Sequence, residues 1–128
     1  MARVLVVDDS PTVGASVVWL LADYGHEVRV AQDGLTALGM LHSFNAEVIL
    51  LDIKLPYIDG LKLLEMIRHN PRYSSTPIVM LSGSKAQEDI QRAIDLGANS
   101  YVTKPFVDET LLSAIEQALT AESAGSAL

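Results

Sequence analysis

Cysteine is absent from this sequence of 128 residues, which excludes disulfides, thiolate zinc sites and thiol nucleophiles. Basic residues are few: 9 Lys and Arg stand against 16 Asp and Glu, for a formal charge of −7. Non-specific binding to nucleic-acid phosphates needs a basic surface, so we expect none here. No apolar run reaches the length of a membrane span, about 20 residues, and no secretory signal is visible. We therefore expect a cytoplasmic protein without direct contact to nucleic acid or membrane.

The length and composition indicate one globular domain. Hydrophobic residues make up 49% of the chain and charged residues 20%, a balance typical of a folded chain. A chain of this size fits a single domain whose core needs no cross-links. The periodic patterns run to about residue 120, and the final segment, AESAGSAL from Ala121, loses them. We expect a domain over residues 1–120 and a flexible C-terminal tail over 121–128.

Apolar runs of strand length alternate five times with helical patterns. Ser10-Pro11 supplies an N-cap and a first-turn proline to the first helix, and Gly25 and Gly97 follow helical runs as stops. Strict alternation predicts a parallel sheet with helices on both faces. The expected fold is α/β: a doubly wound, five-stranded parallel (βα)5 sheet of the flavodoxin-like type. We expect strands at 4–8, 27–31, 47–52, 78–82 and 100–103, and helices near 11–24, 34–44, 60–69, 85–97 and 108–120.

Two adjacent carboxylates, Asp8 and Asp9, follow an unbroken run of apolar residues. A strand this apolar is expected to be buried on both faces, where an unpartnered charge costs several kcal/mol. Three more polar side chains, Asp52, Ser82 and Lys104, stand at or just after the ends of other strands. The carboxyl ends of parallel strands form the ligand crevice of an open α/β sheet, so we expect all these side chains to meet at one edge.

The chemistry of this set indicates a metal and a phosphoryl group. Carboxylates within a few ångströms of one another raise each other's pKa or hold a cation. Oxygen ligands without His or Cys favour Mg²⁺ or Ca²⁺ over zinc, and the small number of carboxylates favours Mg²⁺. Lys104 and Ser82 would place a positive charge and a hydroxyl beside the metal, which suits the oxygens of a phosphoryl group in transfer. One carboxylate is then left as a nucleophile, which would give an aspartyl phosphate.

Four segments carry a resemblance to a known family: VVDDS, LLDIKLPYIDG, IVMLSGS and YVTKPF. Over about residues 3–120 they resemble the receiver domain of two-component response regulators, in its stand-alone, chemotaxis-regulator-like type. The resemblance implies a phosphoprotein of a phosphorelay that takes a phosphoryl group from a histidine kinase or a histidine phosphotransfer protein. It implies a signalling domain, not an enzyme, that catalyses its own Mg²⁺-dependent phosphorylation and its dephosphorylation.

Carried over residue by residue, the resemblance makes Asp52 the phosphoacceptor and part of the metal site. Asp9 would bind Mg²⁺ directly, Asp8 largely through water, and the backbone carbonyl of Lys54 would complete the protein ligands. Lys54 and Ser84 lie two residues beyond the acceptor and the hydroxyl residue, where the family varies. These positions flank the path of the attacking water, so a long lysine at 54 is expected to obstruct it and lengthen the phosphoryl lifetime.

The same resemblance implies a switch. Ser82 would be the hydroxyl that moves toward the phosphoryl group, and Lys104 its counter-charge. Tyr101, three residues before the lysine, matches the aromatic that turns inward on activation, with ordinary sheet packing as the alternative. The bond before Pro105 matches the family's usual cis peptide, which an X–Pro bond permits.

Two residues of the first helix, Val18 and Trp19, fall off its apolar stripe, so the spacing predicts that both are exposed. An exposed pair of this kind can mark a partner site, and in receivers this helix lies beside the docking surface for the phosphodonor kinase. The alternative is that Trp19 covers the helix near 108–120. The resemblance also implies a downstream protein effector, and a homodimer through the face formed by 85–97, 100–103 and 108–120.

Rival functions fit the residues less well. A flavodoxin-type electron carrier would need a hydroxyl- and glycine-rich phosphate loop where Asp8 and Asp9 stand. A haloacid-dehalogenase-type phosphatase would need an Asp-x-Asp pair, which Lys54 breaks two residues after Asp52. A receiver-fold module that binds its partners without phosphorylation is the remaining alternative.

Overall fold

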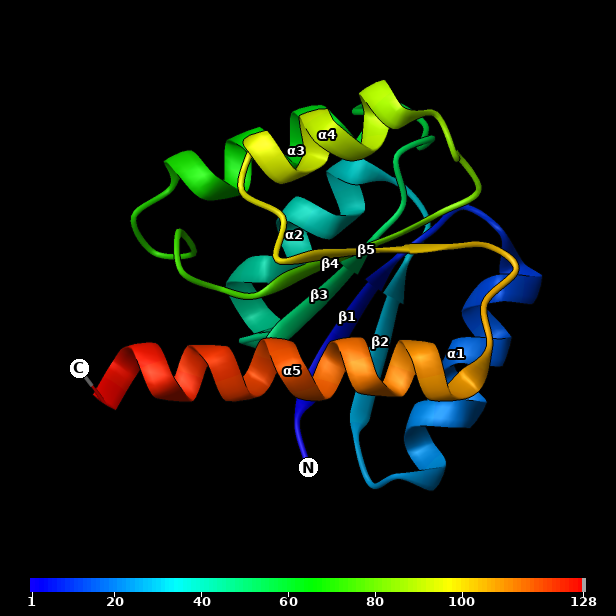
Figure 1. The fold of residues 1–128 in the computed structure, drawn as a ribbon, viewed down its shortest axis with the longest axis vertical. Helices are drawn as coiled ribbons and strands as arrows, with labels where there is room; N and C mark the ends of the chain where they lie inside the picture. The colour runs from blue at the N-terminus through cyan, green and yellow to red at the C-terminus, as the bar shows by residue number, and fades with distance from the viewer. Residues whose placement is uncertain (128) are drawn as a thin grey trace.

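All strands of the protein run parallel in one sheet, in the order β2-β1-β3-β4-β5 (Figure 1). A computed structural model describes residues 1–127, with the side chains of residues 1–120. The expected doubly wound (βα)5 fold is confirmed, with a helix after each strand. The strands are β1 (Arg3–Val7), β2 (Glu27–Ala31), β3 (Val48–Leu51), β4 (Ile78–Ser82) and β5 (Ser100–Thr103), and the helices are α1 (Pro11–Asp23), α2 (Gly34–Phe44), α3 (Gly60–His69), α4 (Gln87–Asp95) and α5 (Asp108–Ala127).

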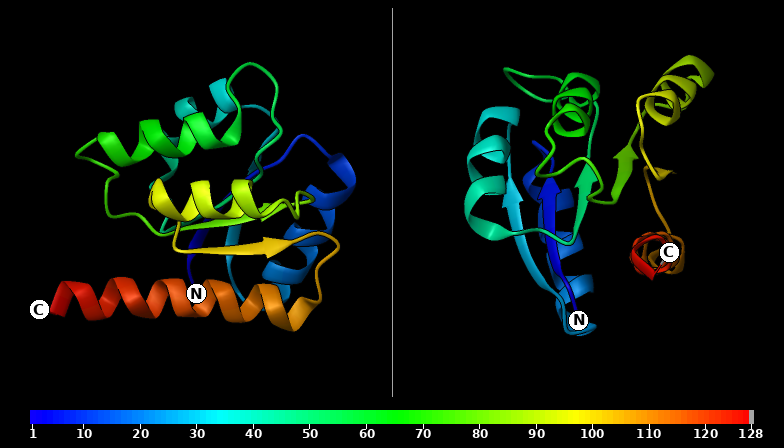
Figure 2. Two further views of the ribbon diagram at one scale, coloured as in Figure 1. Left: turned by 45° about the horizontal axis from the view of Figure 1, so that its top comes forward. Right: turned by 90° about the vertical axis from the view of Figure 1, so that its left-hand side faces the viewer.

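The helices cover both faces of the sheet (Figure 2). Helices α1 and α5 pack on the face that carries Val4 and Val6 of β1. Helices α2, α3 and α4 pack on the opposite face, with Leu5 and Val7. Because alternate residues of a strand point to opposite faces and both faces are covered, the apolar part of β1 is buried throughout.

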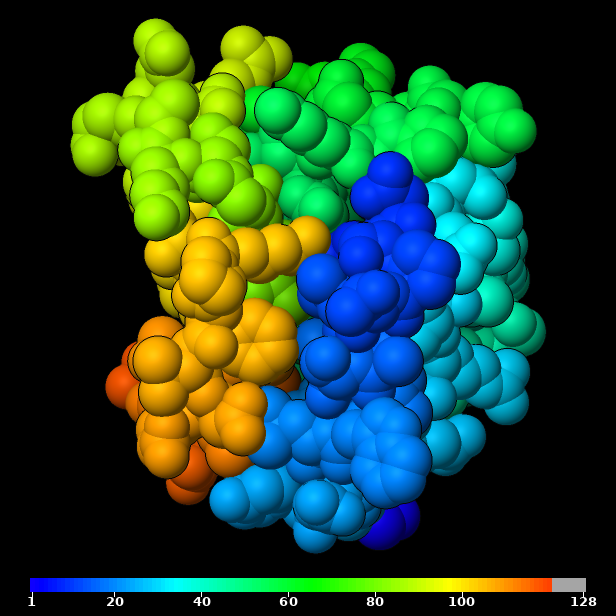
Figure 3. Space-filling view, turned by 90° about the vertical axis from the view of Figure 1, so that its right-hand side faces the viewer, coloured from blue at the N-terminus to red at the C-terminus, as the bar shows by residue number. Residues whose placement is uncertain are grey.

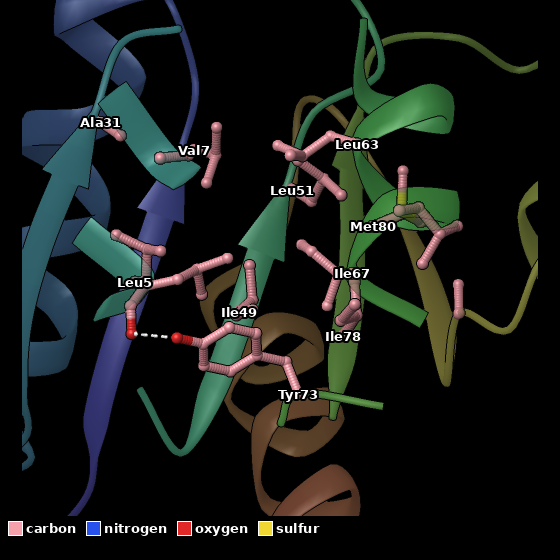
Figure 4. Close-up of a cluster of buried hydrophobic side chains, with 14 of the residues drawn as sticks. Leu5, Val7, Ala31, Ile49, Leu51, Leu63, Ile67, Tyr73, Ile78 and Met80 are labelled. Atoms are coloured by element: carbon pink, nitrogen blue, oxygen red, sulfur yellow. Dashed lines mark hydrogen bonds between the residues drawn. The ribbon is translucent and has the colours of Figure 1, made fainter. Parts of the chain in front are cut away.

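The core on the side of α2, α3 and α4 is drawn in Figure 4. Leu63 and Ile67 of α3 reach the sheet there, beside Ile49 and other strand residues. The hydroxyl of the buried Tyr73 donates a hydrogen bond of 3.1 Å to the carbonyl oxygen of Leu41, the dashed line in Figure 4. A packed apolar layer, in which the buried phenol of Tyr73 has its hydrogen bond, gives the carboxyl ends of the strands a fixed support.

Two strands end one residue earlier than the sequence predicts. β1 ends at Val7 and β3 at Leu51, so that Asp8 and Asp52 are the first residues after their strands. Both keep a sheet-like hydrogen bond, because Asp8 donates its N–H to Ala31 at 3.0 Å and Asp52 donates to Val7 at 3.0 Å. The two carboxylates thus start from backbone that the sheet still fixes.

The helix ends follow the expected caps, with two differences in length. Ser10 accepts the N–H of Val13 at the start of α1, and Gly25 and Gly97 adopt positive φ angles of 82° and 108°. Helix α4 starts at Gln87, two residues later than expected, and α5 runs on to Ala127. The side chains of 121–128 lie outside the described residues, so the flexible tail stays a prediction. Within the described residues, no helix has both the length and the apolar character to cross a membrane.

The loop between β3 and α3 brings Gly60, the first residue of α3, back against the first residues of the loop, Asp52 and Ile53. Gly60 donates its N–H to the carbonyl oxygen of Ile53 at 2.6 Å, and a Cβ added at Gly60 would overlap the carbonyl oxygen of Asp52. Between these points Tyr57 has a φ of 70°, and the N–H of the next residue bonds the carbonyl oxygen of Pro56 at 2.8 Å. This is the hydrogen-bond pattern of a γ-turn, a strained conformation for a residue other than glycine. The loop is therefore held closely against Asp52.

Near the amino-terminal ends of β4 and β5, one arginine forms hydrogen bonds with several segments. The Nε of Arg68, on α3, donates to the carbonyl oxygen of Gly97 at 2.9 Å, and its Nη1 donates to that of Thr76 at 2.7 Å. Its Nη2 donates at 3.1 Å to Oδ1 of Asn99, which also accepts the N–H of Ile78 at 2.8 Å. The end of α3, the start of β4 and the turn after α4 are thus joined by one planar guanidinium.

Candidate functional site

Three polar side chains are buried where β1, β3 and β4 end. Asp8 is 1% exposed, Asp52 7% and Ser82 1%. Asp9 follows Asp8 but is exposed. The expected convergence at the carboxyl edge therefore takes place, and Asp8 and Asp52 are not solvated loop acids.

Lys104 provides the counter-charge. Its Nζ donates to Oδ2 of Asp8 at 2.6 Å and to Oδ2 of Asp52 at 2.8 Å. The other oxygens accept backbone N–H groups, because Ser10 donates to Oδ1 of Asp8 at 2.9 Å and Ile53 donates to Oδ1 of Asp52 at 2.7 Å. Each buried carboxylate thus has an ammonium on one oxygen and an amide on the other, which holds both side chains in fixed orientations.

The side chain of Lys104 is itself only 18% exposed. Burial alone would lower the pKa of Lys104, but the hydrogen bonds and charges of Asp52 and Asp8 outweigh it and raise the pKa above the ordinary value of 10.5. Lys104 is therefore a cation throughout the physiological range. The backbone N–H of Lys104 bonds the carbonyl oxygen of Ser82 at 2.9 Å, which fixes the start of its side chain beside β4.

The donor set fits a small hard cation. Carboxylate oxygens of Asp8, Asp9 and Asp52 lie within 4.8 Å of one another, and all are oxygen ligands of the kind that Mg²⁺ prefers. The side chain of Lys54 is exposed. The roles of its backbone carbonyl as a ligand and of its side chain in phosphoryl lifetime stay predictions.

The predicted switch residues are linked through Ser84. Oγ of Ser82 accepts the N–H of Ser84 at 3.3 Å, and the hydroxyl of Tyr101 donates to the carbonyl oxygen of Ser84 at 2.8 Å. Tyr101 is half-buried against the core on the α4 side. The Lys104–Pro105 peptide bond is cis, the isomer that the resemblance implies.

The sequence did not predict that Asp89 is a hydrogen-bond partner of Ser84. Oγ of Ser84 donates to Oδ2 of Asp89, in the first turn of α4, at 2.6 Å. Asp89 stands in a polar stretch without a motif, so only the tertiary structure identifies it. The structure therefore turns Ser84 toward α4, and its expected role in phosphoryl lifetime stays a prediction.

Helix α1 borders the site and carries a large exposed aromatic. In Figure 3 the dark blue residues that follow β1 lie above the lighter blue of α1, beside the orange segment after β5. Trp19 is 75% exposed, so the alternative that it covers α5 is wrong. Val18, expected to be exposed as well, is half-buried and lines a hollow between Trp19 and Val30. The reason is that α1 packs against β2 on that side.

Comparisons with known proteins agree with this geometry. The family model described as "Response regulator receiver domain" matches residues 4–116. Protein PilG of Pseudomonas aeruginosa is 36% identical, over 89% of this chain and 84% of that protein. Chemotaxis protein CheY of the same organism is 35% identical, over 90% of this chain and 94% of that protein. The solved chemotaxis response regulator CheY4 of Vibrio cholerae superposes with a TM-score of 0.86 at 36% identity, over 93% of this chain and 99% of that chain.

Some relatives are much longer. The chain spans only 15% of the gliding motility regulatory protein of Myxococcus xanthus, to which it is 35% identical over 90% of its own length. It matches NtrX from Brucella abortus with a TM-score of 0.91 at 35% identity, over 98% of this chain and 29% of that chain. The chain thus matches nearly the whole of the short relatives and a part of the long ones. As the motifs predict, the chain belongs to the response regulator receiver domain family.

Proposed function

We propose that the protein accepts a phosphoryl group on Asp52, from a histidine kinase or a histidine phosphotransfer protein, in a Mg²⁺-dependent reaction that changes a partner-binding surface. The family is one of phosphoacceptor signalling domains, and the proposal assigns its chemistry to residues of this chain. The observation that carries it is the buried pair Asp8 and Asp52 bridged by the Lys104 ammonium at 2.6 and 2.8 Å.

The reaction divides among these residues as follows. A carboxylate oxygen of Asp52 attacks the phosphorus atom, the P–N bond to the donor imidazole breaks, and the imidazole leaves with the bonding electrons. The N–H of Ile53, bonded to Oδ1, fixes the orientation of the attacking carboxylate. The ammonium of Lys104 and the hydroxyl of Ser82 then bind phosphoryl oxygens, in a buried place where such contacts are strong.

Three carboxylates beside an incoming phosphoryl group would repel it without a cation. Asp8, Asp9, Asp52 and the backbone carbonyl of Lys54 would hold Mg²⁺, which when bound neutralises negative charge on the carboxylates and on the phosphoryl group. The domain itself thus supplies the nucleophile and the charge stabilisation. It would catalyse its own phosphorylation from the donor and its own dephosphorylation by water.

The acceptor assignment has a direct test. With acetyl phosphate and Mg²⁺, intact mass spectrometry is expected to detect one phosphate adduct in the wild type and none in Asp52→Asn. The substitution keeps the shape and removes the nucleophilic charge. Withholding Mg²⁺ is expected to abolish the wild-type adduct.

An exposed carboxylate on α1 provides the matched control, because Asp23→Asn changes the same charge away from the site. It is expected to be labelled like the wild type. An adduct that persists in Asp52→Asn would refute the assignment. A wild type that no donor labels would favour the module that works without phosphorylation.

The proposed output is a change of surface in the cytoplasm. Tyr101 belongs to β5, in the face formed by α4, β5 and α5, and bonds the carbonyl oxygen of Ser84. A shift of Ser82 toward the phosphoryl group would alter that face. A downstream protein effector, or a second copy of the chain, is the proposed occupant of this face.

We propose that the kinase or phosphotransfer protein docks on α1, with Trp19 as its main contact. Trp19 is 75% exposed between two hollows of the surface, and buried tryptophans are frequent hot spots of interfaces. Trp19→Ala is expected to lower kcat/KM for phosphotransfer from a phosphohistidine donor protein by about 30-fold. Labelling by acetyl phosphate is expected to be unchanged. Tyr24→Ala, at the end of the same helix and also exposed, is the control; equal losses in both variants would contradict the proposal.

A further inference from the structure

Ser84 contacts three parts of the molecule at once. Its N–H bonds Oγ of Ser82 at 3.3 Å, its carbonyl oxygen accepts the hydroxyl of Tyr101 at 2.8 Å, and its Oγ donates to Asp89 at 2.6 Å. The last of these is a short hydrogen bond to a carboxylate, the strong charge-assisted kind. No single motif predicts this arrangement, because the partners come from β4, β5 and α4.

Helix α4 lacks the side-chain N-cap that α1, α2 and α3 have. Its N-cap residue is Ala86, which has no side chain able to accept an N–H of the first turn. Oγ of Ser84 accepts the N–H of Ala86 at 3.4 Å instead. Ala93 is the buried residue of α4, whereas α3 buries Leu63, Leu64 and other residues. The Ser84 hydroxyl thus contacts both the N-cap residue and the first turn of α4.

We infer that Asp89 is a positioning residue that acts through Ser84. The two side chains form what we term the Ser84–Asp89 latch, which ties the segment after Ser82 to the first turn of α4. A shift of Ser82 toward a phosphoryl group on Asp52 pulls on the N–H of Ser84. The latch passes that shift to α4, and the Ser84 carbonyl passes it to Tyr101. The inference rests on the proposed function, and it adds the route by which α4 responds.

The direction of the effect follows from the geometry. The latch is closed in the same arrangement in which Tyr101 points inward and bonds Ser84. Breaking it removes support for that arrangement, so binding of a phosphoryl group at Asp52 loses a favourable coupled change. Asp89→Ala is therefore expected to weaken binding of beryllofluoride with Mg²⁺, a mimic of the aspartyl phosphate, by about tenfold.

The test is an NMR titration of ¹⁵N-labelled protein with beryllofluoride and Mg²⁺. In the wild type, the amide signals of Ser84 and of Ile90 on α4 are expected to shift together. In Asp89→Ala the Ser84 signal still shifts, whereas the Ile90 signal shifts far less. Asp89→Asn keeps an oxygen that accepts the Ser84 hydroxyl and is expected to restore the affinity to within about threefold of the wild type.

Glu88→Ala is the matched control, because Glu88 is exposed and carries the same charge in the same first turn. It removes an equal interaction with the helix dipole but no contact with Ser84, so its affinity and its Ile90 shift are expected to match the wild type. Equal behaviour of Asp89→Ala and Glu88→Ala would overturn the latch, and so would an Ile90 shift that survives in Asp89→Ala.

Failure of the proposed function would give a different result. If acetyl phosphate and beryllofluoride both leave wild-type Asp52 unmodified, the phosphoacceptor role is wrong. The latch is then tested in the unmodified protein, by the ring proton shifts of Tyr101. They are expected to change in Asp89→Ala and not in Glu88→Ala; no change in either would overturn the latch independently.

Discussion

Lys104→Met is expected to lower the free energy of unfolding by about 3 kcal/mol in Mg²⁺-free buffer. Methionine keeps much of the apolar stem but removes the ammonium that bridges Asp8 and Asp52. Two buried carboxylates then face each other without a counter-charge, which costs more than the loss of an exposed ion pair. Urea denaturation followed by circular dichroism measures the loss.

The difference in stability between the wild type and Lys104→Met is also expected to depend on pH and on Mg²⁺. Because the pKa of Lys104 is raised above 10.5 in the folded protein, its contribution to stability is complete below 10.5 and is lost as pH rises through the folded-state pKa. Lys104→Met should lack this loss of stability at alkaline pH, because it has no ammonium to deprotonate. Mg²⁺ should stabilise the variant more than the wild type, because no ammonium competes for the carboxylates.

Lys85→Met is the control for the loss of a lysine as such. Lys85 is exposed in the loop before α4, and its replacement should change the free energy of unfolding by less than about 0.5 kcal/mol. A Lys104→Met protein as stable as the control, without dependence on Mg²⁺, would show that the bridge contributes nothing.

Gly60→Ala is expected to cost about 3 kcal/mol or more of stability and to slow phosphorylation of Asp52. A Cβ at this position would overlap the carbonyl oxygen of Asp52 and lie 2.7 Å from Cα of Ile53. Both are backbone atoms and cannot move aside by changing rotamer. Relief of the overlap must displace the residue that carries the acceptor carboxylate. Denaturation and the rate of labelling by acetyl phosphate measure the two effects.

Gly39→Ala makes the same change at a position with free space and is expected to have the opposite effect. Gly39 lies on α2, and nothing within 4 Å would meet its Cβ. Alanine favours the helix over glycine, so this variant should gain about 0.5–1 kcal/mol. A Gly60→Ala protein that is as stable as the wild type would mean that the loop after β3 is not held against Asp52.

Much of the fold could be predicted because it depends on local patterns. Apolar runs such as residues 48–51 have the length of a buried strand, and the spacing of Leu111 and Ile115 is helical. The rule that ligands gather at the carboxyl ends of parallel strands then brought Asp52 and Lys104 to one edge. The ends of the strands were predicted less exactly, because the last residue of a strand depends on hydrogen bonds to the neighbouring strands.

The rest depends on contacts that no periodicity encodes. The bond from Ser84 to Asp89 requires one rotamer of each side chain and the path of the loop between them. The exposure of Trp19 also depends on tertiary contacts, because helical spacing alone left open whether another helix covers it. For Gly60, the sequence shows only a glycine after an aspartate, and the close approach to Asp52 is a property of the folded loop.

The hydrogen bonds of Arg68 at the amino-terminal ends of the strands have a consequence for how α4 would respond to a shift of Ser84. Arg68 holds the carbonyl oxygen of Gly97, directly after the last turn of α4, together with Asn99 at the start of β5. The first turn is joined to its surroundings through the Ser84 hydroxyl. The C-terminal end of the helix is thus held at several atoms and the first turn through one hydroxyl, so we expect a shift of Ser84 to tilt the helix about its C-terminal end as a pivot, without translating it. For a helix of nine residues, about 13 Å long at 1.5 Å per residue, a tilt of about 10° would move the first turn by roughly 2 Å while the pivot stays in place.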